Sequence, residues 1–268
     1  MSVKNNPIGI FDSGVGGLTV ASAIKQMLPD ENIIYFGDTA HLPYGDKSSE
    51  AIVNYSRRIT NFLLEHDVKV IVVACNTASA TAFPELKAEF GDRTLVTDVV
   101  NPVVEYICGR KFRKTGVIGT KRTIETGTYT NMVRERCPES GVVSMATPLL
   151  VPMIEEGFIF DDISNGIIRR YLSDRRFNGI DALVLGCTHY PIIKNQISKF
   201  FNFEIEVVDS ARIVSSSLRE LLARRGLLRD SRERGTDQFY VSDHTTWFEK
   251  IAGMFFDNQI ELSLANIW

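Results

Sequence analysis

The alternation of short apolar runs with longer amphipathic stretches constrains the fold of this chain most strongly. Nearly continuous Val, Ile, Leu and Phe runs are typical of strands that are buried on both faces. Because helix-length stretches separate them, the order predicts α/β architecture with mostly parallel sheets flanked by helices. The expected strands are residues 8–11, 33–36, 68–74, 95–97, 116–119, 142–145, 182–185 and 206–208, with 240–242 as a final edge strand. The expected helices are residues 18–28, 48–65, 78–90, 124–136, 163–172 and 192–200.

This architecture repeats along the chain. One strand–helix series opens with a run that ends in Asp12, the other opens with a run that precedes Thr120, and each contains a strand followed by a cysteine. A duplicated domain is the simplest interpretation. We expect a first domain from residues 1–98 plus 209–268 and a second from residues 99–208. Ligands of parallel sheets bind at the carboxyl ends of the strands, so two facing edges would form a cleft between the domains.

Composition indicates a globular protein that does not bind nucleic acid. The chain has 268 residues, of which 44% are hydrophobic, as is ordinary for a globular protein. Its net charge is −3, and because nucleic-acid-binding proteins usually carry a positive net charge, nucleic acid is not the expected partner. Six arginines between residues 219 and 234 are interpreted as the solvated face of a helix. The polar N-terminus and the absence of an apolar run near ~20 residues predict a cytoplasmic protein with no membrane partner.

The four cysteines stand singly, and none belongs to a C-x-x-C pair, so a zinc site or thioredoxin-type motif has no support. Free thiols are expected in a reducing cytoplasm. Cys108 and Cys137 are interpreted as structural residues. Cys75 and Cys187 each follow an apolar run directly, and this position makes them candidates for chemistry.

Cys75 is followed by Asn76 and Thr77, where a helix is expected to begin. A helix N-terminus favours anions and lowers a thiol pKa, so this site could hold a carboxylate and also favour a thiolate. The alternative is that Cys75 is only a small buried hydrophobic residue.

Cys187 is followed by Thr188 and His189. An imidazole near a thiol can take its proton or stabilise the thiolate. The alternative for His189 is a packed histidine bonded to the backbone. We favour the chemical interpretation because two such sites suggest a pair with one function.

Other polar groups follow strands at the same edge. The stretch that begins with Asp12 and Ser13 is rich in glycine, but Thr19 replaces the glycine that a dinucleotide fingerprint needs, and a P-loop Gly-Lys-Ser/Thr is missing. Its backbone N–H groups could instead bind a carboxylate, and Asp12 could assist a thiol or an ammonium group or simply cap a helix. Weaker candidates, each in a turn or an apolar context, are Tyr44, Gly45, Thr120 and Glu155.

Five motifs in order carry a resemblance over nearly the whole chain: IGIFDSGVGGLTV, YFGDTAHLPYG, VVACNTASA, VPMIEEG and LVLGCTHYP. On these residues the chain closely resembles the bacterial, cofactor-independent glutamate racemases. The resemblance implies two similar α/β domains with the active site between them, neither pyridoxal phosphate nor a metal, and a role in supplying D-glutamate for peptidoglycan. The expected ligand is a small molecule, L- or D-glutamate, and a homodimer is the default assembly.

The resemblance also assigns roles to residues. Cys75 would act on the Cα proton of D-glutamate and Cys187 on that of L-glutamate, assisted by Asp12, Glu155 and His189. The implied substrate contacts are Asp12, Ser13, Tyr44, Gly45, Asn76, Thr77, Thr120, Thr188 and His189.

Two thiols suit racemisation because a proton must leave one face of a carbon and another must return to the opposite face. Three alternatives stay open on the sequence: a Cys-His hydrolase, in which Cys75 would be idle, a relative that acts on aspartate or another acid, and a non-catalytic amino-acid-binding protein with this fold.

Overall fold

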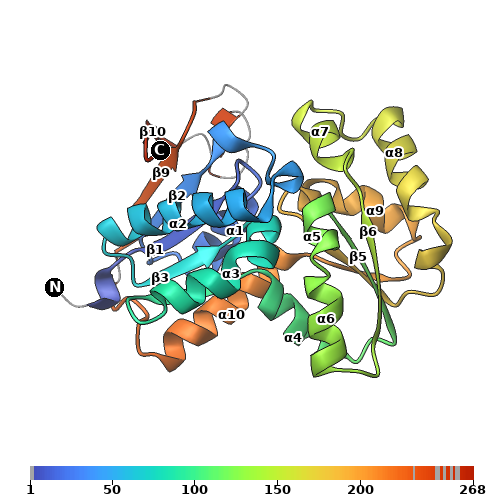
Figure 1. The fold of residues 1–268 in the computed structure, drawn as a ribbon, viewed down its shortest axis with the longest axis horizontal. Coiled ribbons are helices and arrows are strands. Elements are labelled where there is room, and N and C mark those ends of the chain that lie inside the picture. The colour runs from blue at the N-terminus through green and yellow to red at the C-terminus, as the bar shows by residue number, and fades with distance from the viewer. Residues whose placement is uncertain (1–2, 232, 245–247, 250–251, 254–255, 257–259) are drawn as a thin grey trace.

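The protein, described here from a computed structural model, contains two parallel sheets that lie side by side (Figure 1). The structure describes residues 3–231, 233–244, 248–249, 252–253, 256 and 260–268. The first sheet has the strand order β10-β9-β2-β1-β3-β4 and the second has the order β6-β5-β7-β8. The predicted α/β fold with mostly parallel sheets is therefore confirmed. Within the described ranges, no helix is long and apolar enough to cross a membrane.

The first sheet is built around β1, which pairs in parallel with β2 on one side and β3 on the other. All residues of these three strands are buried, as their continuous apolar runs predicted. The strands of this sheet are β1 (Ile8–Asp12), β2 (Ile33–Gly37), β3 (Val70–Val73), β4 (Leu95–Asp98), β9 (Asp237–Val241) and β10 (Leu262–Leu264). Its helices are α1 (Leu18–Met27), α2 (Ser49–Glu65), α3 (Asn76–Phe90) and α10 (Ser210–Arg224), with short 3₁₀ turns η1 (Val3–Asn5), η2 (Thr39–His41) and η3 (Tyr44–Asp46).

The second sheet is built in the same way around β5, which pairs with β6 and β7. Its strands are β5 (Lys114–Gly119), β6 (Gly141–Ala146), β7 (Ala182–Gly186) and β8 (Glu206–Val208). The helices between β4 and β8 are α4 (Val100–Arg110), α5 (Lys121–Glu125), α6 (Thr128–Arg136), α7 (Leu150–Glu155), α8 (Asp162–Leu172) and α9 (Lys194–Phe200), with the 3₁₀ turns η4 (Arg175–Phe177) and η5 (Tyr190–Ile193).

Two element predictions were wrong in detail. The strand predicted at the edge of the sheet belongs to β9, which lies between β2 and β10, so β10 is the edge strand. That strand has only three residues, none of them buried, so its apolar signal is weak. The single helix predicted over residues 124–136 is two helices, because Gly127 adopts φ +65° and ends the first before α6 begins.

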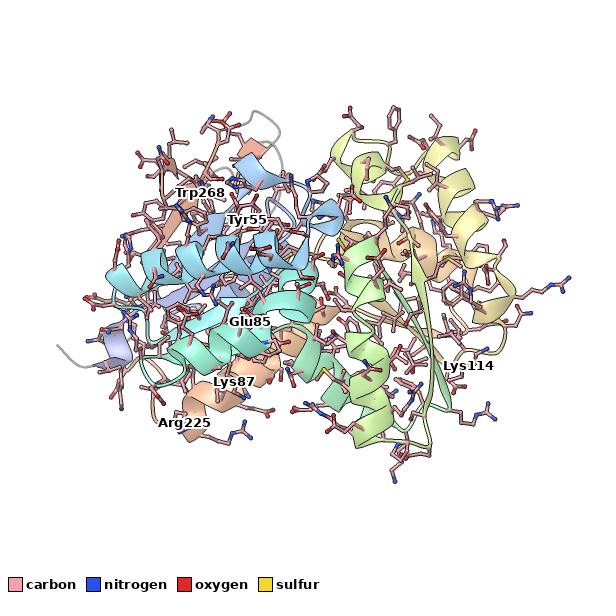
Figure 2. The ribbon with its side chains drawn as sticks, in the orientation of Figure 1. Tyr55, Glu85, Lys87, Lys114, Arg225 and Trp268 are labelled. Atoms are coloured by element: carbon pink, nitrogen blue, oxygen red, sulfur yellow. A yellow bond between two sulfur atoms is a disulfide. The ribbon has the colours of Figure 1, made fainter. Side chains whose placement is uncertain are left out.

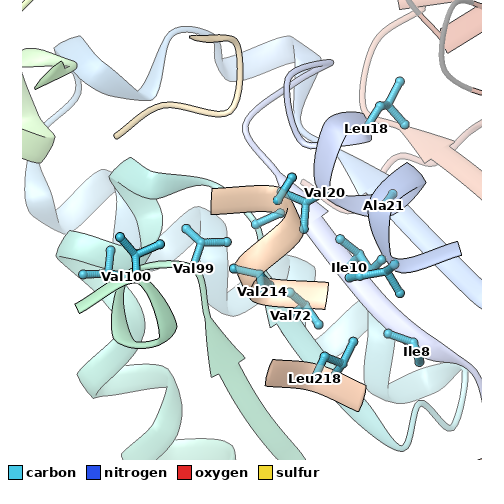
Figure 3. Close-up of a cluster of buried hydrophobic side chains, with 14 of the residues drawn as sticks. Ile8, Ile10, Leu18, Val20, Ala21, Val72, Val99, Val100, Val214 and Leu218 are labelled. Atoms are coloured by element: carbon cyan, nitrogen blue, oxygen red, sulfur yellow. The ribbon is translucent and has the colours of Figure 1, made fainter. Parts of the chain in front are cut away.

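A continuous apolar core joins the two sheets. Helix α10 packs on α1 and α4, and their buried side chains merge with those of β1, β3, β5 and β7. Figure 3 shows Val214 of α10 between Val99 and Val100 on one side and Ile10 of β1 on the other. The chain passes between the sheets twice, from β4 into α4 and from β8 into α10, so this core anchors both connections.

The expectation of free thiols was wrong for one pair of cysteines. Cys108 of α4 and Cys137, just after α6, form a disulfide with a Cα–Cα distance of 5.6 Å. The pairing depends on the packing of α4 against α6, which cysteine spacing alone does not reveal. Cys75 and Cys187 are free and buried.

The arginine-rich segment is only partly a helix face, as its prediction had it. Helix α10 ends at Arg224, and the following chain folds back onto the turn before β2. There the backbone N–H of Arg229 donates to Glu31 Oε1, and its guanidinium donates to the carbonyl of Asp30. Arg219, Arg224, Arg225 and Arg234 are exposed as predicted, Arg229 alone is shown held by the first sheet, and Arg232 lies outside the described residues.

Candidate active site

A cavity of about 260 Å³ lies between the carboxyl ends of the strands of the two sheets. Both free cysteines line it, with most of the residues singled out in the sequence: Ser13, Tyr44, Gly45, Asn76, Thr77, Thr120, Glu155, Thr188 and His189. A larger groove of about 660 Å³ lies beside α4, α10 and β8, and none of these residues lines it. Chemistry rather than size therefore identifies the smaller cavity as the candidate site.

Cys75 enters the cavity from the first sheet as the N-cap of α3. The backbone N–H of Ala78 donates to Cys75 Sγ at 3.5 Å. The Cys75 thiol in turn donates to Ser13 Oγ at 3.6 Å. Burial, and then the nearby charge of Asp12, raise the pKa of Cys75 to about 12. The helix N-terminus was expected to lower this pKa, but burial outweighs it, so at neutral pH Cys75 is a protonated thiol.

Cys187 enters from the second sheet, directly after β7. His189 Nδ1 lies 3.8 Å from Cys187 Sγ, and His189 Nε2 lies 3.1 Å from Glu155 Oε1 of α7. The contact with Glu155 is an ion pair rather than an aligned hydrogen bond, because Nε2 makes no hydrogen bond to the described residues. Burial alone would lower the pKa of His189, but its interactions with Cys187 and Glu155 outweigh burial and raise the pKa to about 10. The ring is therefore an imidazolium at neutral pH, placed to stabilise negative charge on the sulfur.

This raised pKa predicts how stability depends on pH. The folded-state pKa of His189 is about 10, above the value of 6.5 expected when it is unfolded. The stabilisation is then complete below pH 6.5 and is lost as pH rises to about 10. We expect the difference in free energy of unfolding between wild type and His189→Gln to shrink across this interval, measured by urea titration at successive pH values. A difference that stays constant with pH would show that His189 titrates alike in both states.

Asp12 lies behind the cavity wall and does not line the cavity. Its fully buried carboxylate accepts hydrogen bonds from the backbone N–H groups of Gly14 and Gly17 at 3.0 Å and from Thr188 Oγ1 at 3.3 Å. Burial raises the pKa of Asp12. Asp12 thus links the glycine-rich loop after β1 to the segment that carries Cys187, while its direct contact with a substrate stays a prediction.

Three threonines connect the two sides of the cavity. The hydroxyl of Thr77 at the start of α3 lies 2.9 Å from that of Thr120 and 3.1 Å from that of Thr123, which are themselves 2.9 Å apart. Thr77 and Thr120 were singled out in the sequence, whereas buried Thr123 was missed. Thr120 is the N-cap of α5, and a threonine three residues after such a position carries no signal by itself.

The turn that presents Tyr44 is anchored by the first sheet. Tyr44 donates its hydroxyl to Asp38 Oδ2 at 2.7 Å, and His41 Nδ1 lies 2.8 Å from Asp38 Oδ1. The ring of His41 stacks on Tyr55 and meets Trp268 edge-on, each at 4.2 Å between centroids. Figure 2 shows Trp268 beside Tyr55 on the α2 side of the molecule. The aromatic contacts therefore hold this turn from outside the cavity.

Comparison with known proteins agrees with this arrangement. Residues 16–217 match the family model for Asp/Glu/Hydantoin racemases. A glutamate racemase from Geobacter metallireducens is 42% identical over 254 residues, which cover 94% of this chain and 93% of that protein. A glutamate racemase from Chlorobaculum tepidum is also 42% identical, over 96% of this chain and 94% of the relative.

Solved structures agree as well. The crystal structure of glutamate racemase from Francisella tularensis, in complex with D-glutamate, matches with a TM-score of 0.91 and 36% identity over 98% of each chain. An aspartate racemase from Picrophilus torridus, at 20% identity and a TM-score of 0.57, shares the fold alone. The resemblance that the sequence motifs indicated is therefore confirmed. The chain belongs to the glutamate racemases of the Asp/Glu/Hydantoin racemase family.

Proposed function

We propose that this chain interconverts L- and D-glutamate by moving Cα protons between the substrate and the thiols of Cys75 and Cys187. The observation that carries the proposal is that two buried free thiols, one after a strand of each sheet, line one cavity. A racemisation with two bases needs an acid/base group on each side of the bound carbon, and this arrangement supports that assignment. The proposal is also supported by relatives that are glutamate racemases and by the D-glutamate complex of the Francisella tularensis protein.

The protonation states of the two sides support a direction for the first step. Cys75 is a thiol at neutral pH, whereas His189 carries a positive charge beside Cys187. In this state Cys187, as a thiolate stabilised by His189, would remove the Cα proton of L-glutamate. Cys75 would deliver a proton to the opposite face to give D-glutamate. The proton is then on Cys187 and the charge on Cys75, so the enzyme is set for the reverse reaction.

The carbanion-like transition state needs stabilisation because the Cα proton of an amino acid is very weakly acidic. Hydrogen-bond donors near the cavity, such as the hydroxyls of Ser13, Thr77 and Thr120, are available to the two carboxylates of glutamate. A buried site strengthens these interactions because water is excluded from it. Ser13, Tyr44, Gly45, Asn76, Thr77, Thr120, Thr188 and His189 are proposed as the substrate contacts, with Asp12, Glu155 and His189 assisting the thiols.

The wider assignments belong to the same proposal. A first domain of residues 1–98 with 209–268 and a second of residues 99–208 is supported by the membership of the two sheets. Supply of D-glutamate for peptidoglycan is supported by the bacterial relatives. A cytoplasmic location and a homodimer stay predictions from the sequence.

The function is tested by following L-glutamate with the purified, pyridoxal-free protein in D₂O by proton NMR, with circular dichroism in parallel. We expect the Cα proton signal and the optical signal to decay together, because each turnover replaces the Cα proton with solvent deuterium. L-aspartate in the same assay tests the nearest alternative substrate. A stable optical signal with L-glutamate would contradict the proposal, and rapid decay with L-aspartate alone would shift it to that acid.

A further inference from the structure

We propose that Tyr129 is a positioning residue whose phenol fixes the side-chain amide of Asn76, so that the amide nitrogen is kept for a carboxylate of the substrate. This inference rests on the proposed function and adds a residue that the sequence motifs did not reveal. Tyr129 belongs to α6, on the side of the second sheet, whereas Asn76 is the first residue of α3, on the side of the first sheet.

The contact between the two residues is short and buried. Tyr129 donates its hydroxyl to Asn76 Oδ1 at 2.7 Å, and both residues are about 2% exposed. No other acceptor for this hydroxyl is found among the described residues. Because a buried hydroxyl needs an acceptor, the carbonyl oxygen of the amide must face Tyr129 and the nitrogen must point elsewhere.

The amide nitrogen of Asn76 is buried and makes no hydrogen bond to the described part of the chain. A buried donor without an acceptor destabilises the fold, so its presence calls for an explanation. Asn76 lines the cavity that holds both thiols. A carboxylate oxygen is a pure acceptor and therefore matches a pure donor such as this N–H group.

The phenol of Tyr129 stays protonated, and so stays a hydrogen-bond donor, at neutral pH. Burial, followed by the charges of Asp98 and Cys187, raises the pKa of Tyr129 above its ordinary value. The hydroxyl therefore keeps its proton, and the orientation of the amide does not change with pH. Tyr129 and Asn76 thus contact each other from different sides of the cavity, α6 and α3.

The test compares Tyr129→Phe with wild type in steady-state racemisation of both enantiomers. Without the phenol the amide can rotate, and we expect KM to rise about threefold to tenfold while kcat stays within about twofold, as for the loss of one hydrogen bond that acts on binding. In an Asn76→Ala background, Tyr129→Phe should have no further effect on KM, because the group it positions is gone.

A matched control is Tyr106→Phe, which removes a phenol that donates to Glu206 and does not line the cavity. We expect wild-type KM values for it. An unchanged KM in Tyr129→Phe would overturn the inference. So would an equal rise in KM in the Asn76→Ala background, because that pattern indicates a structural effect of Tyr129 independent of Asn76.

A second measurement covers the case in which Tyr129→Phe does not fold. In wild-type protein with ¹⁵N-labelled asparagine, the side-chain amide signal that disappears in Asn76→Ala should shift when D-glutamate is added. A signal that does not move overturns the inference even when racemisation is intact. A wild-type protein without racemase activity overturns the proposed function instead, so the two failures are distinguishable.

Discussion

Replacing either free thiol by a hydroxyl, as Cys75→Ser or Cys187→Ser, is expected to lower kcat/KM for racemisation by on the order of a thousandfold. A serine hydroxyl is a much weaker acid than a thiol and cannot take or supply the Cα proton at a useful rate. Because both thiols line one cavity and each has its own proton-handling neighbours, neither can replace the other. Circular dichroism with each enantiomer measures the loss.

Isotope exchange separates the two halves of the reaction. Cys75→Ser keeps the thiolate and imidazolium pair proposed for Cys187 and His189, so we expect it to exchange the Cα proton of L-glutamate with D₂O while the optical signal holds. Cys187→Ser should show the reverse preference, for D-glutamate, but slower exchange, because the buried thiol of Cys75 must first lose its proton. Proton NMR of each variant with each enantiomer measures this exchange. Full racemisation in either variant would contradict the two-base mechanism, because it would show that one of the two thiols takes no part in the reaction.

The paired replacement of Cys108 and Cys137 by serine is the matched control. These residues form the disulfide between α4 and the end of α6, and neither lines the cavity. We expect turnover within about twofold of wild type and a lower melting temperature, because the cross-link limits the unfolded chain. The effect of replacing cysteines in general is then distinguished from the loss of the two thiols in the cavity.

The strands and the two catalytic candidates could be predicted because their signals are local. The apolar run of β7 ends at Gly186 and Cys187 follows at once, so the sequence itself places this thiol at the carboxyl edge of a buried strand. The same reasoning applies to Cys75 after β3. These positions depend only on periodicity and on the rule that parallel sheets bind ligands at this edge.

The contacts within the site could not be predicted because they join distant segments of the chain. Tyr129 reaches Asn76 across 53 positions, and the hydrogen bond from Thr188 to Asp12 spans 176. The high pKa of Cys75 also follows from its burial, which a local rule about helix N-termini does not include. Such contacts and pKa shifts arise only when the folded chain brings the two sheets together. No single motif contains that information.

Gly16→Ala is expected to lower kcat about a hundredfold with a smaller loss of stability. A Cβ atom at this position would lie 2.4 Å from Thr188 Oγ1 and 2.5 Å from His189 Nδ1, closer than real Cβ contacts. Either side chain can move away only by giving up a contact of the site, Thr188 with Asp12 or His189 with Cys187. A displacement of about 1 Å can cost about a hundredfold in rate, whereas overpacking costs about 1–3 kcal/mol.

Gly166→Ala is the control for this substitution, because, apart from the adjoining residues and the backbone of α8 itself, no atom of the described residues lies within 4 Å of a Cβ atom at that position. We expect unchanged kcat and a slightly higher melting temperature, since alanine favours a helix more than glycine does. The two variants are compared by racemisation kinetics and thermal unfolding. A Gly16→Ala protein with wild-type kcat would show that Thr188 and His189 need not hold their observed positions. The glycine-rich loop would then act only as a turn after β1, rather than as the surface against which the Cys187 segment is positioned.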